Sequence, residues 1–223
     1  MKKDLWIQAI SKYIIGILAV GLLIFLPAGT FAYPNGWLLM AILFIPIFFA
    51  GLILLWKNPA LLESRLKSKE KQGGQGMLVK LSGLMFLGGF IAAGLDFRAD
   101  GSSLPRWLSI AAAVLFLAFY LLYGEVLREN TYLSRIIEVQ QGQKVIDRGL
   151  YAIVRHPMYA ATIGLFLSIP LVLGSIWALI IFLFYPFMIA KRIRLEERLL
   201  EQELEGYQAY QKKVRYRLIP YIW

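Results

Sequence analysis

The chain lacks cysteine altogether, has one histidine among 223 residues, and is poor in charge, with 17% Asp, Glu, Lys and Arg. The missing cysteines exclude disulfides, thiol catalysis and cysteine metal sites. A metal site built from several histidines is excluded too, because His156 stands alone. We therefore expect no bound metal. Soluble proteins carry roughly 25% charged residues, so the low charge content indicates that much of the surface does not face water.

What the chain has instead is long apolar runs, which make 59% of its residues hydrophobic. About 20 apolar helical residues cross the hydrocarbon layer of a bilayer. We therefore expect an all-α integral membrane protein. The four predicted spans are Tyr13–Tyr33, Trp37–Trp56, Met77–Leu95 and Trp107–Leu127. The first run after Lys2 and Lys3 resembles a signal peptide, but the further spans favour an uncleaved first helix.

The distribution of positive charge predicts the topology. The connection 57–80 holds six Lys and Arg against two Glu, and such loops stay on the cytoplasmic side. We therefore expect both termini and this connection in the cytoplasm, at the inner membrane if the chain is prokaryotic. The net charge of +10 is explained by cytoplasmic loops and anionic lipid, so we expect the bilayer as a partner and no nucleic acid.

The apolar stretch 157–190 is too long for one ordinary span and is interrupted near its middle by Pro170 and Gly174. This pattern predicts a helical hairpin that enters the membrane and returns. An amphipathic tail helix is expected over 191–213. The alternative is one long kinked helix, which would place the basic tail outside. We expect residues 1–127 to form the four spans and residues 128–223 to form a catalytic region within one integrated domain.

Arg155 and His156 come directly before Pro157, which suits the first turn of a helix. The free amides of that turn, together with Arg155, would bind a carboxylate or another anion. The alternative is an interfacial anchor in which Arg155 and His156 reach for the headgroups, with Tyr151 and Tyr159 in an aromatic belt.

Two carboxylates of the tail helix point toward the protein. At 3.6 residues per turn, Glu197 falls within the stripe that includes Ile193 and Leu200, and Glu196 lies at its edge. Buried acids need partners, and a ribose diol is one suitable partner. The alternative is ion pairing with Arg155, Arg192 or Arg194. The ionisable Glu125, near the inner end of the fourth span, is a further candidate.

Residues 128–148 precede both segments, and an irregular ribbon with a glycine turn is possible around Val139 and Val145. The exposed backbone of such a ribbon would suit a planar base. The alternative is an ordinary polar loop.

The order of these motifs resembles the isoprenylcysteine carboxyl methyltransferase family and the related phospholipid methyltransferases. The resemblance runs from Arg128 to the C-terminus and depends on Arg155-His156-Pro157-Met158-Tyr159, on Glu196-Glu197 and on Arg215-Tyr216-Arg217. It implies a membrane-embedded methyltransferase that uses S-adenosylmethionine at the cytoplasmic face. The implied acceptor is lipophilic, a prenylated or lipid molecule, with a carboxylate as the expected methyl acceptor. The sequence departs from the eukaryotic pattern at Gln143, where histidine is frequent.

From the resemblance and the motifs together we assign candidate site residues. The catalytic candidates are Arg155, His156 and Glu197. The cofactor-binding candidates are Val139, Gln143, Tyr151, His156, Pro157, Tyr159, Glu196 and Glu197. If the acceptor were a thiol, phenol or amine, His156 would be the available base.

Two other functions remain open. Membrane sterol reductases, which use NADPH, are similar in C-terminal architecture, but no signature for a 2′-phosphate is present. A transporter or a membrane scaffold is the non-enzymatic alternative, although broken helices in pairs and mid-membrane charges are missing.

Overall fold

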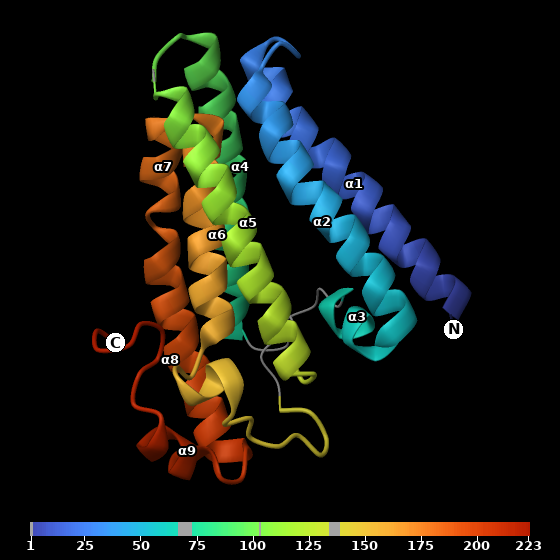
Figure 1. The fold of residues 1–223 in the computed structure, drawn as a ribbon, viewed down its shortest axis with the longest axis vertical. Coiled ribbons are helices and arrows are strands. Elements are labelled where there is room, and N and C mark those ends of the chain that lie inside the picture. Colours follow the sequence, from blue (N-terminus) through green and yellow to red (C-terminus); the bar gives the residue numbers. More distant parts are fainter. Residues whose placement is uncertain (1, 67–72, 103, 134–138) are drawn as a thin grey trace.

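The computed structural model describes residues 2–66, 73–102, 104–133 and 139–223, and these form a bundle of long helices (Figure 1). The N-terminal elements are α1 (Lys2–Ala28), α2 (Pro34–Lys57), α3 (Pro59–Leu66), α4 (Gly73–Arg98) and α5 (Arg106–Glu129). The C-terminal elements are η1 (Gly149–Ala152), α6 (Pro157–Leu173), α7 (Ile176–Phe182), α8 (Tyr185–Glu203) and α9 (Tyr207–Lys213). Both termini lie toward the end of the bundle that carries α3 and α9 (Figure 1); this end is called the α9 end below.

All four predicted spans are confirmed as helices α1, α2, α4 and α5. The largest difference is in α1, which starts at Lys2 and ends at Ala28. The prediction began at Tyr13 because polar residues precede it, but a helix continues past the hydrocarbon edge at no cost in backbone hydrogen bonds. The helix ends early because Gly29 takes a left-handed conformation with φ of 68°, which is a common way for a helix to stop.

The predicted hairpin is also confirmed. Helix α6 runs away from the α9 end, and α7 and α8 return (Figure 1). The turn depends on Gly174, which has a φ of 76°, and on Ser175, whose hydroxyl caps α7 by accepting a hydrogen bond from the amide of Ala178 at 3.2 Å. The alternative of one long kinked helix is therefore wrong.

The boundary of the tail helix is wrong in the prediction. Helix α8 passes without a break through residue 191, because no residue between Pro186 and Glu203 disrupts a helix. The predicted helix 191–213 instead breaks at Gly206, with a φ of 83°, and resumes as α9. One continuous helix thus links the membrane level to the α9 end.

No strand forms over residues 139–148, where the chain takes turns and irregular backbone. The possible ribbon is therefore not found there, and residues 134–138 lie outside the described part. Gly142 has a φ of 73° and makes the tight turn in which the amide of Gln143 donates to the carbonyl of Gln140 at 3.0 Å. The polar-loop alternative describes this segment.

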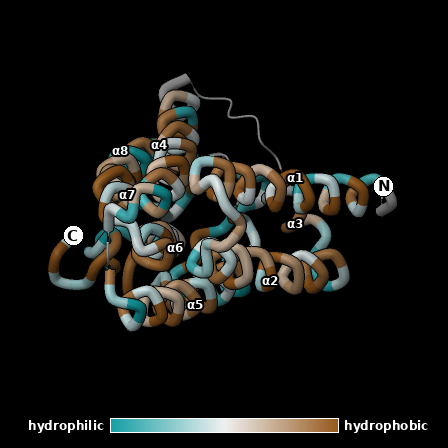
Figure 2. Tube along the Cα trace, turned by 90° about the horizontal axis from the view of Figure 1, so that it is seen from above, coloured by the Kyte–Doolittle hydropathy of each residue, from teal (hydrophilic) through white to brown (hydrophobic). Residues whose placement is uncertain are grey.

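Apolar side chains cover the outside of the bundle as well as its core. Figure 2 shows hydrophobic residues along all of the long helices, with α1 and α2 extending to one side. Trp56, Leu121 and Phe187 are 82%, 78% and 74% exposed. Among the described residues, five helical segments are long and apolar enough to cross a membrane. The protein is a multi-pass integral membrane protein, because water would not tolerate such a surface.

Glycines allow close contacts between helices, as two examples show. A Cβ at Gly164 of α6 would lie 2.3 Å from the ring of Phe119 in α5, and a Cβ at Gly94 of α4 would lie 2.5 Å from the carbonyl oxygen of Ile24 in α1. Small residues allow such backbone approach in membrane bundles. These contacts fix α5 against α6 and α1 against α4.

The end opposite α9 is held by a buried polar group. Asp96 at the end of α4 is 6% exposed, accepts from the Ser175 hydroxyl at 2.5 Å and accepts from the amide of Ser102 at 2.9 Å. The hydroxyl of Tyr33 donates to the carbonyl of Leu173 at 2.6 Å. These bonds attach the hairpin turn to the loops of the neighbouring helices.

Candidate functional site

The site begins with a buried ion pair between the α6 start and α8. Arg155 donates from Nε to Oε1 of Glu197 at 2.7 Å, and Nε2 of His156 lies 3.2 Å from the same oxygen. Arg217 donates from Nε to the other oxygen, Oε2, at 2.7 Å. Two guanidinium groups and one imidazole thus surround the Glu197 carboxylate. Glu197, at 3% exposure, therefore has the compensation that a buried carboxylate requires.

The C-terminal segment joins the same group through its backbone. The amide of Arg155 donates to the carbonyl of Tyr216 at 2.9 Å, and the amide of His156 donates to the carbonyl of Arg217 at 2.9 Å. Nη1 of Arg155 also donates to the carbonyls of Val214 and Arg215 at 2.7 and 2.8 Å. Because the ring of Pro157 disfavours a helical conformation in the residue before it, His156 stays outside the helix, and this segment pairs with the tail.

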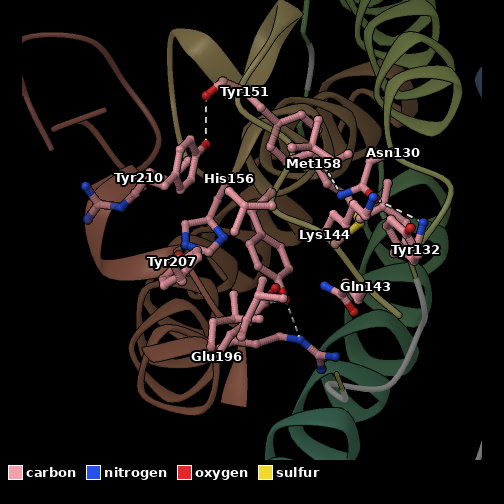
Figure 3. A pocket seen from close by; sticks show the side chains of 18 residues that line it. Asn130, Tyr132, Gln143, Lys144, Tyr151, His156, Met158, Glu196, Tyr207 and Tyr210 are labelled. Atoms are coloured by element: carbon pink, nitrogen blue, oxygen red, sulfur yellow. Dashed lines mark hydrogen bonds between the residues drawn. The ribbon is translucent and has the colours of Figure 1, made fainter. Parts of the chain in front are cut away.

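Beside this group lies a cavity, called the polar cavity below, with an empty volume of about 830 Å³ out to its mouth. Figure 3 shows His156 and Tyr207 on one side and Asn130, Lys144 and Gln143 on the other. The remaining lining residues come from the same loop, η1, the α6 start, α8 and α9: Tyr132, Leu133, Val145, Ile146, Tyr151, Arg155, Met158, Tyr159, Arg192, Glu196, Leu200, Leu204 and Tyr210. Two parts of the chain distant in sequence, residues 130–159 and 192–210, thus enclose one space.

The membrane-facing edge of the polar cavity is a hydrogen-bonded trio. Tyr159 donates its hydroxyl hydrogen to Oε2 of Glu196 at 2.5 Å and accepts from Nε of Arg192 at 3.0 Å. Glu196 and Arg192 stand one turn apart on α8, and Tyr159 reaches them from the first turn of α6. The trio holds one anion and one cation at the cavity edge in fixed positions.

One hydroxyl in the polar cavity has no protein partner among the described residues. The oxygen of Tyr207 is buried and makes no hydrogen bond, whereas the neighbouring Tyr210 donates to the carbonyl of Tyr151 at 2.7 Å. Burial, with a smaller effect from Glu197, raises the pKa of Tyr207 above its ordinary value, so its hydrogen is retained. Buried polar groups nearly always have partners, so this hydroxyl is an exception among the groups that line the cavity.

A second cavity lies at membrane level between α2, α4, α5, α6 and α8, and is called the apolar cavity below. Its empty volume is about 1520 Å³ out to its mouth. Apolar and aromatic side chains dominate its lining, among them Leu43, Phe86, Phe116 and Phe166. Met158, Tyr159 and Arg192 line both cavities, so the two spaces meet at the trio.

Most of the cofactor-binding candidates line the polar cavity: Gln143, Tyr151, His156, Tyr159 and Glu196. The other three do not. Pro157 is buried in the first turn of α6, and Val139 packs against the cluster of Leu204, Tyr207, Tyr210 and Val214. Glu197 has the alternative interaction weighed from the sequence, an ion pair with Arg155. Whether any candidate touches a cofactor stays a prediction.

Of the two remaining candidates from the sequence, Arg155 lies in the site and Glu125 does not. Arg155 lines the polar cavity as well as pairing with Glu197. Glu125 lies elsewhere: its carboxylate bonds to Arg128, both side chains are largely accessible, and it lines neither cavity.

Sequence reasoning did not assign several residues to the site. Asn130, Lys144 and Arg192 line the polar cavity, and Arg217 bonds to Glu197. The signal for Arg192 was its spacing of four residues before Glu196, which predicts a shared helix face. No comparable spacing relates Arg217 to α8, because the loop between them sets that contact.

Comparison with known proteins adds two findings. Residues 108–202 match the model of the isoprenylcysteine carboxyl methyltransferase (ICMT) family. The structure is similar to that of a eukaryotic intramembrane Ras methyltransferase, ICMT, with a TM-score of 0.58 and 18% identity, covering 92% of this chain and 73% of that one. No curated protein sequence matches significantly. At this identity, the structural likeness establishes the shared fold.

The shared fold and the matched segment define the class of this protein as an all-α membrane methyltransferase. The segment that matches the ICMT family model, residues 108–202, runs from α5 into the last turn of α8. The matched segment contains Arg155, His156, Tyr159, Arg192, Glu196 and Glu197. It thus includes both the trio and most of the ion-paired group.

Proposed function

We propose that this protein transfers the methyl group of S-adenosylmethionine to the carboxylate of a lipophilic acceptor at the cytoplasmic face of the membrane. The observation that carries the proposal is the meeting of the two cavities at Tyr159 and Arg192. One cavity is polar and open at the α9 end, and the other is apolar and at membrane level. A water-soluble methyl donor and a membrane-resident acceptor need such a pair of adjoining spaces.

The polar cavity has the chemistry that S-adenosylmethionine requires. Glu196 is an anion for the ribose hydroxyls or the sulfonium, and Lys144 is a cation for the carboxylate. Leu133, Val145, Leu200 and Leu204 offer apolar contact to an adenine. The hydroxyl of Tyr207, which has no partner among the described residues, is available to donate to the cofactor. When bound, S-adenosylmethionine supplies an electrophilic methyl group on a sulfonium.

The chain's own residues contribute position and electrostatics. A carboxylate acceptor is already ionised, so no general base is needed. The Arg192 guanidinium, at the junction, is suited to orient that carboxylate, and Tyr159 restrains the guanidinium through its hydrogen bond. Holding two reactants in an aligned geometry is itself a large source of rate acceleration.

Glu197 and Arg155 are proposed to act as positioning residues. The Glu197 carboxylate is fully engaged with Arg155, His156 and Arg217, and it fixes the α6 start against α8. This fixes Tyr159 opposite Arg192 and Glu196. His156 lines the polar cavity while its Nε2 contacts Glu197, so its proposed role is to contact the cofactor.

The acceptor is proposed to place its tail in the apolar cavity. The structural relative is described as a Ras methyltransferase acting as an isoprenylcysteine carboxyl methyltransferase. By analogy, an S-prenylated cysteine with a free carboxylate is the first acceptor to test here. The basic connection 57–80 and the basic residues near the α9 end support a cytoplasmic position for this end.

The proposal is tested with purified protein in lipid nanodiscs, methyl-labelled S-adenosylmethionine and S-prenylcysteine. The expected product is a base-labile methyl ester. In parallel, S-adenosylhomocysteine should raise the melting temperature and NADPH should not. Stabilisation by NADPH alone would favour the reductase alternative, and no stabilisation by either, together with no labelled product, would contradict the proposal.

A further inference from the structure

The short helix η1 is attached to the end of α5 through one carboxylate. Glu129, the last residue of α5, accepts a hydrogen bond at its Oε2 from the amide of Leu150 at 2.8 Å. The same carboxylate fills the space beside Gly149, because a Cβ built on Gly149 would overlap both of its oxygens. Gly149 also has a φ of 58°, a left-handed conformation that glycine adopts without strain. Position 149 therefore suits glycine both in its conformation and in its contact with Glu129.

Glu129 supplies a hydrogen-bond partner that η1 does not have in its own sequence. The first amides of a helix have no acceptor within that helix, and the side chain of Arg148, the residue before η1, does not cap it. Glu129 comes from 21 residues earlier in the chain and accepts from one of these amides. Hydrogen bonds to a charged group are stronger than those between neutral groups, so this bond holds the start of η1 on the end of α5.

Tyr151 in η1 is fixed at both of its ends in the wall of the polar cavity. Its hydroxyl accepts from Nδ2 of Asn130 at 3.1 Å, and its carbonyl accepts from the hydroxyl of Tyr210 at 2.7 Å; Figure 3 shows all three side chains around the cavity. Since Asn130 directly follows Glu129, two adjacent bonds join the end of α5 to η1. Glu129 itself lines neither cavity, so it acts on the polar cavity through Tyr151.

We infer that Glu129 is a positioning residue: it holds η1 on α5 and thereby sets the place of Tyr151 in the wall of the polar cavity. This inference deepens the proposed function and rests on it, because that cavity is where the methyl donor is proposed to bind. Without the Glu129 carboxylate, the start of η1 loses its attachment, and the bond from Asn130 is left to hold the Tyr151 ring to α5. The apolar cavity keeps its lining, since no residue of η1 contributes to it.

The experiment compares Glu129→Ala with Glu129→Gln and with the control Glu125→Ala, all in nanodiscs. Glutamine keeps a side-chain oxygen that can accept from the Leu150 amide. Glu125 is also a glutamate near the end of α5, but its partner is Arg128 and it lines neither cavity. Three quantities are measured: the hydrogen exchange of residues 149–154 in the ligand-free protein, the affinity for S-adenosylhomocysteine and the affinity for S-prenylcysteine.

Glu129→Ala is expected to speed hydrogen exchange in residues 149–154 and to weaken S-adenosylhomocysteine binding by about tenfold, with S-prenylcysteine binding unchanged. Glu129→Gln should keep most of the wild-type affinity, and Glu125→Ala all of it. A general structural defect would weaken the binding of both ligands, and glutamine would not rescue it selectively.

Unchanged hydrogen exchange in Glu129→Ala, or an equal loss of affinity for both ligands, would overturn the inference. A wild type that does not bind S-adenosylhomocysteine contradicts the proposed function alone. Hydrogen exchange is measured without any ligand, so it still decides whether Glu129 holds η1 in place.

Discussion

Arg155 and Glu197 are 42 residues apart in the chain, yet the Nε of one lies 2.7 Å from Oε1 of the other, with both side chains buried. This pair joins the extended segment before α6 to the middle of α8. Because His156 and Tyr159 follow Arg155, and Glu196 precedes Glu197, the pair also sets the geometry of both cavities. Its energetic role is the basis for the first prediction.

Replacing Glu197 with glutamine should destabilise the protein and disorder the polar cavity. The change removes the charge that compensates Arg155 and Arg217, and breaking a buried pair costs about 3–5 kcal/mol. Thermal unfolding in nanodiscs measures the loss of stability, and titration calorimetry with S-adenosylhomocysteine measures cofactor affinity. The matched variant is Glu196→Gln, which should leave stability nearer to that of the wild type. Equal stability of Glu197→Gln and wild type would show that the pair is not a structural link.

Replacing Arg155 with lysine should not restore the pair. The guanidinium donates to Glu197 and to the carbonyls of Val214 and Arg215, and an ammonium on a flexible stem cannot reproduce that fork. We expect a melting temperature below that of the wild type and greater protease cleavage of the segment after Lys213. Protection of this segment to the wild-type level would contradict the docking role assigned to Arg155.

Replacing Tyr207 with phenylalanine should weaken cofactor binding without destabilising the free protein. The Tyr207 hydroxyl makes no bond to described protein groups, so its removal loses no protein contact and removes a buried polar group. The expected loss of affinity for S-adenosylhomocysteine is about 1–2 kcal/mol. The control is Tyr210→Phe, which loses its bond to the Tyr151 carbonyl and should lower the melting temperature. Unchanged affinity in Tyr207→Phe would remove this hydroxyl from the site.

Replacing Tyr159 with phenylalanine should slow methyl transfer more than it weakens cofactor binding. The variant leaves Arg192 and Glu196 without the hydroxyl that joins them, so the cation at the junction is less well placed for the acceptor. A loss of about 1–3 kcal/mol in transition-state stabilisation is expected from kcat/KM. If the variant instead had reduced cofactor affinity and unchanged kcat, Tyr159 would contribute to cofactor binding alone.

Replacing Asp96 with alanine should lower stability while leaving catalysis intact. Asp96 accepts from Ser175 and Ser102 at the end opposite α9, and leaving those donors without a partner costs about 1–3 kcal/mol. The melting temperature should fall, and the KM values for donor and acceptor measured below that temperature should match the wild type. A changed KM would show that the hairpin turn communicates with the site.

The sequence predicted the membrane spans and the hairpin, but not the bounds of the tail helix or the contacts between elements. Apolar runs predicted the four spans, and Pro170 with Gly174 predicted the hairpin. Helical spacing predicted that Glu197 faces the protein, and it does so at 3% exposure. Its choice of ion-pair partners depends on how the C-terminal loop folds back, and no periodic pattern specifies the path of an irregular loop. The contact with Arg217 was missed for this reason.

The apolar cavity was beyond sequence reasoning for a related cause. Its lining comes from five helices, and hydrophobic residues facing a cavity look the same in sequence as those facing lipid or packed neighbours. The sequence alone does not show which glycines of a membrane helix, such as Gly83, line a cavity. By contrast, the motif Arg155-His156-Pro157 was informative because proline and charge have few roles at the start of a membrane helix.

The unbroken course of α8 through residue 191 makes the spacing between donor and acceptor a matter of helical register. Met188, Arg192, Glu196 and Leu200 recur at four-residue intervals along one rod, so an inserted residue anywhere in this stretch would rotate everything beyond it by about 100°. The relative placement of the groups in the two cavities therefore depends on the length of α8 between Met188 and Leu200.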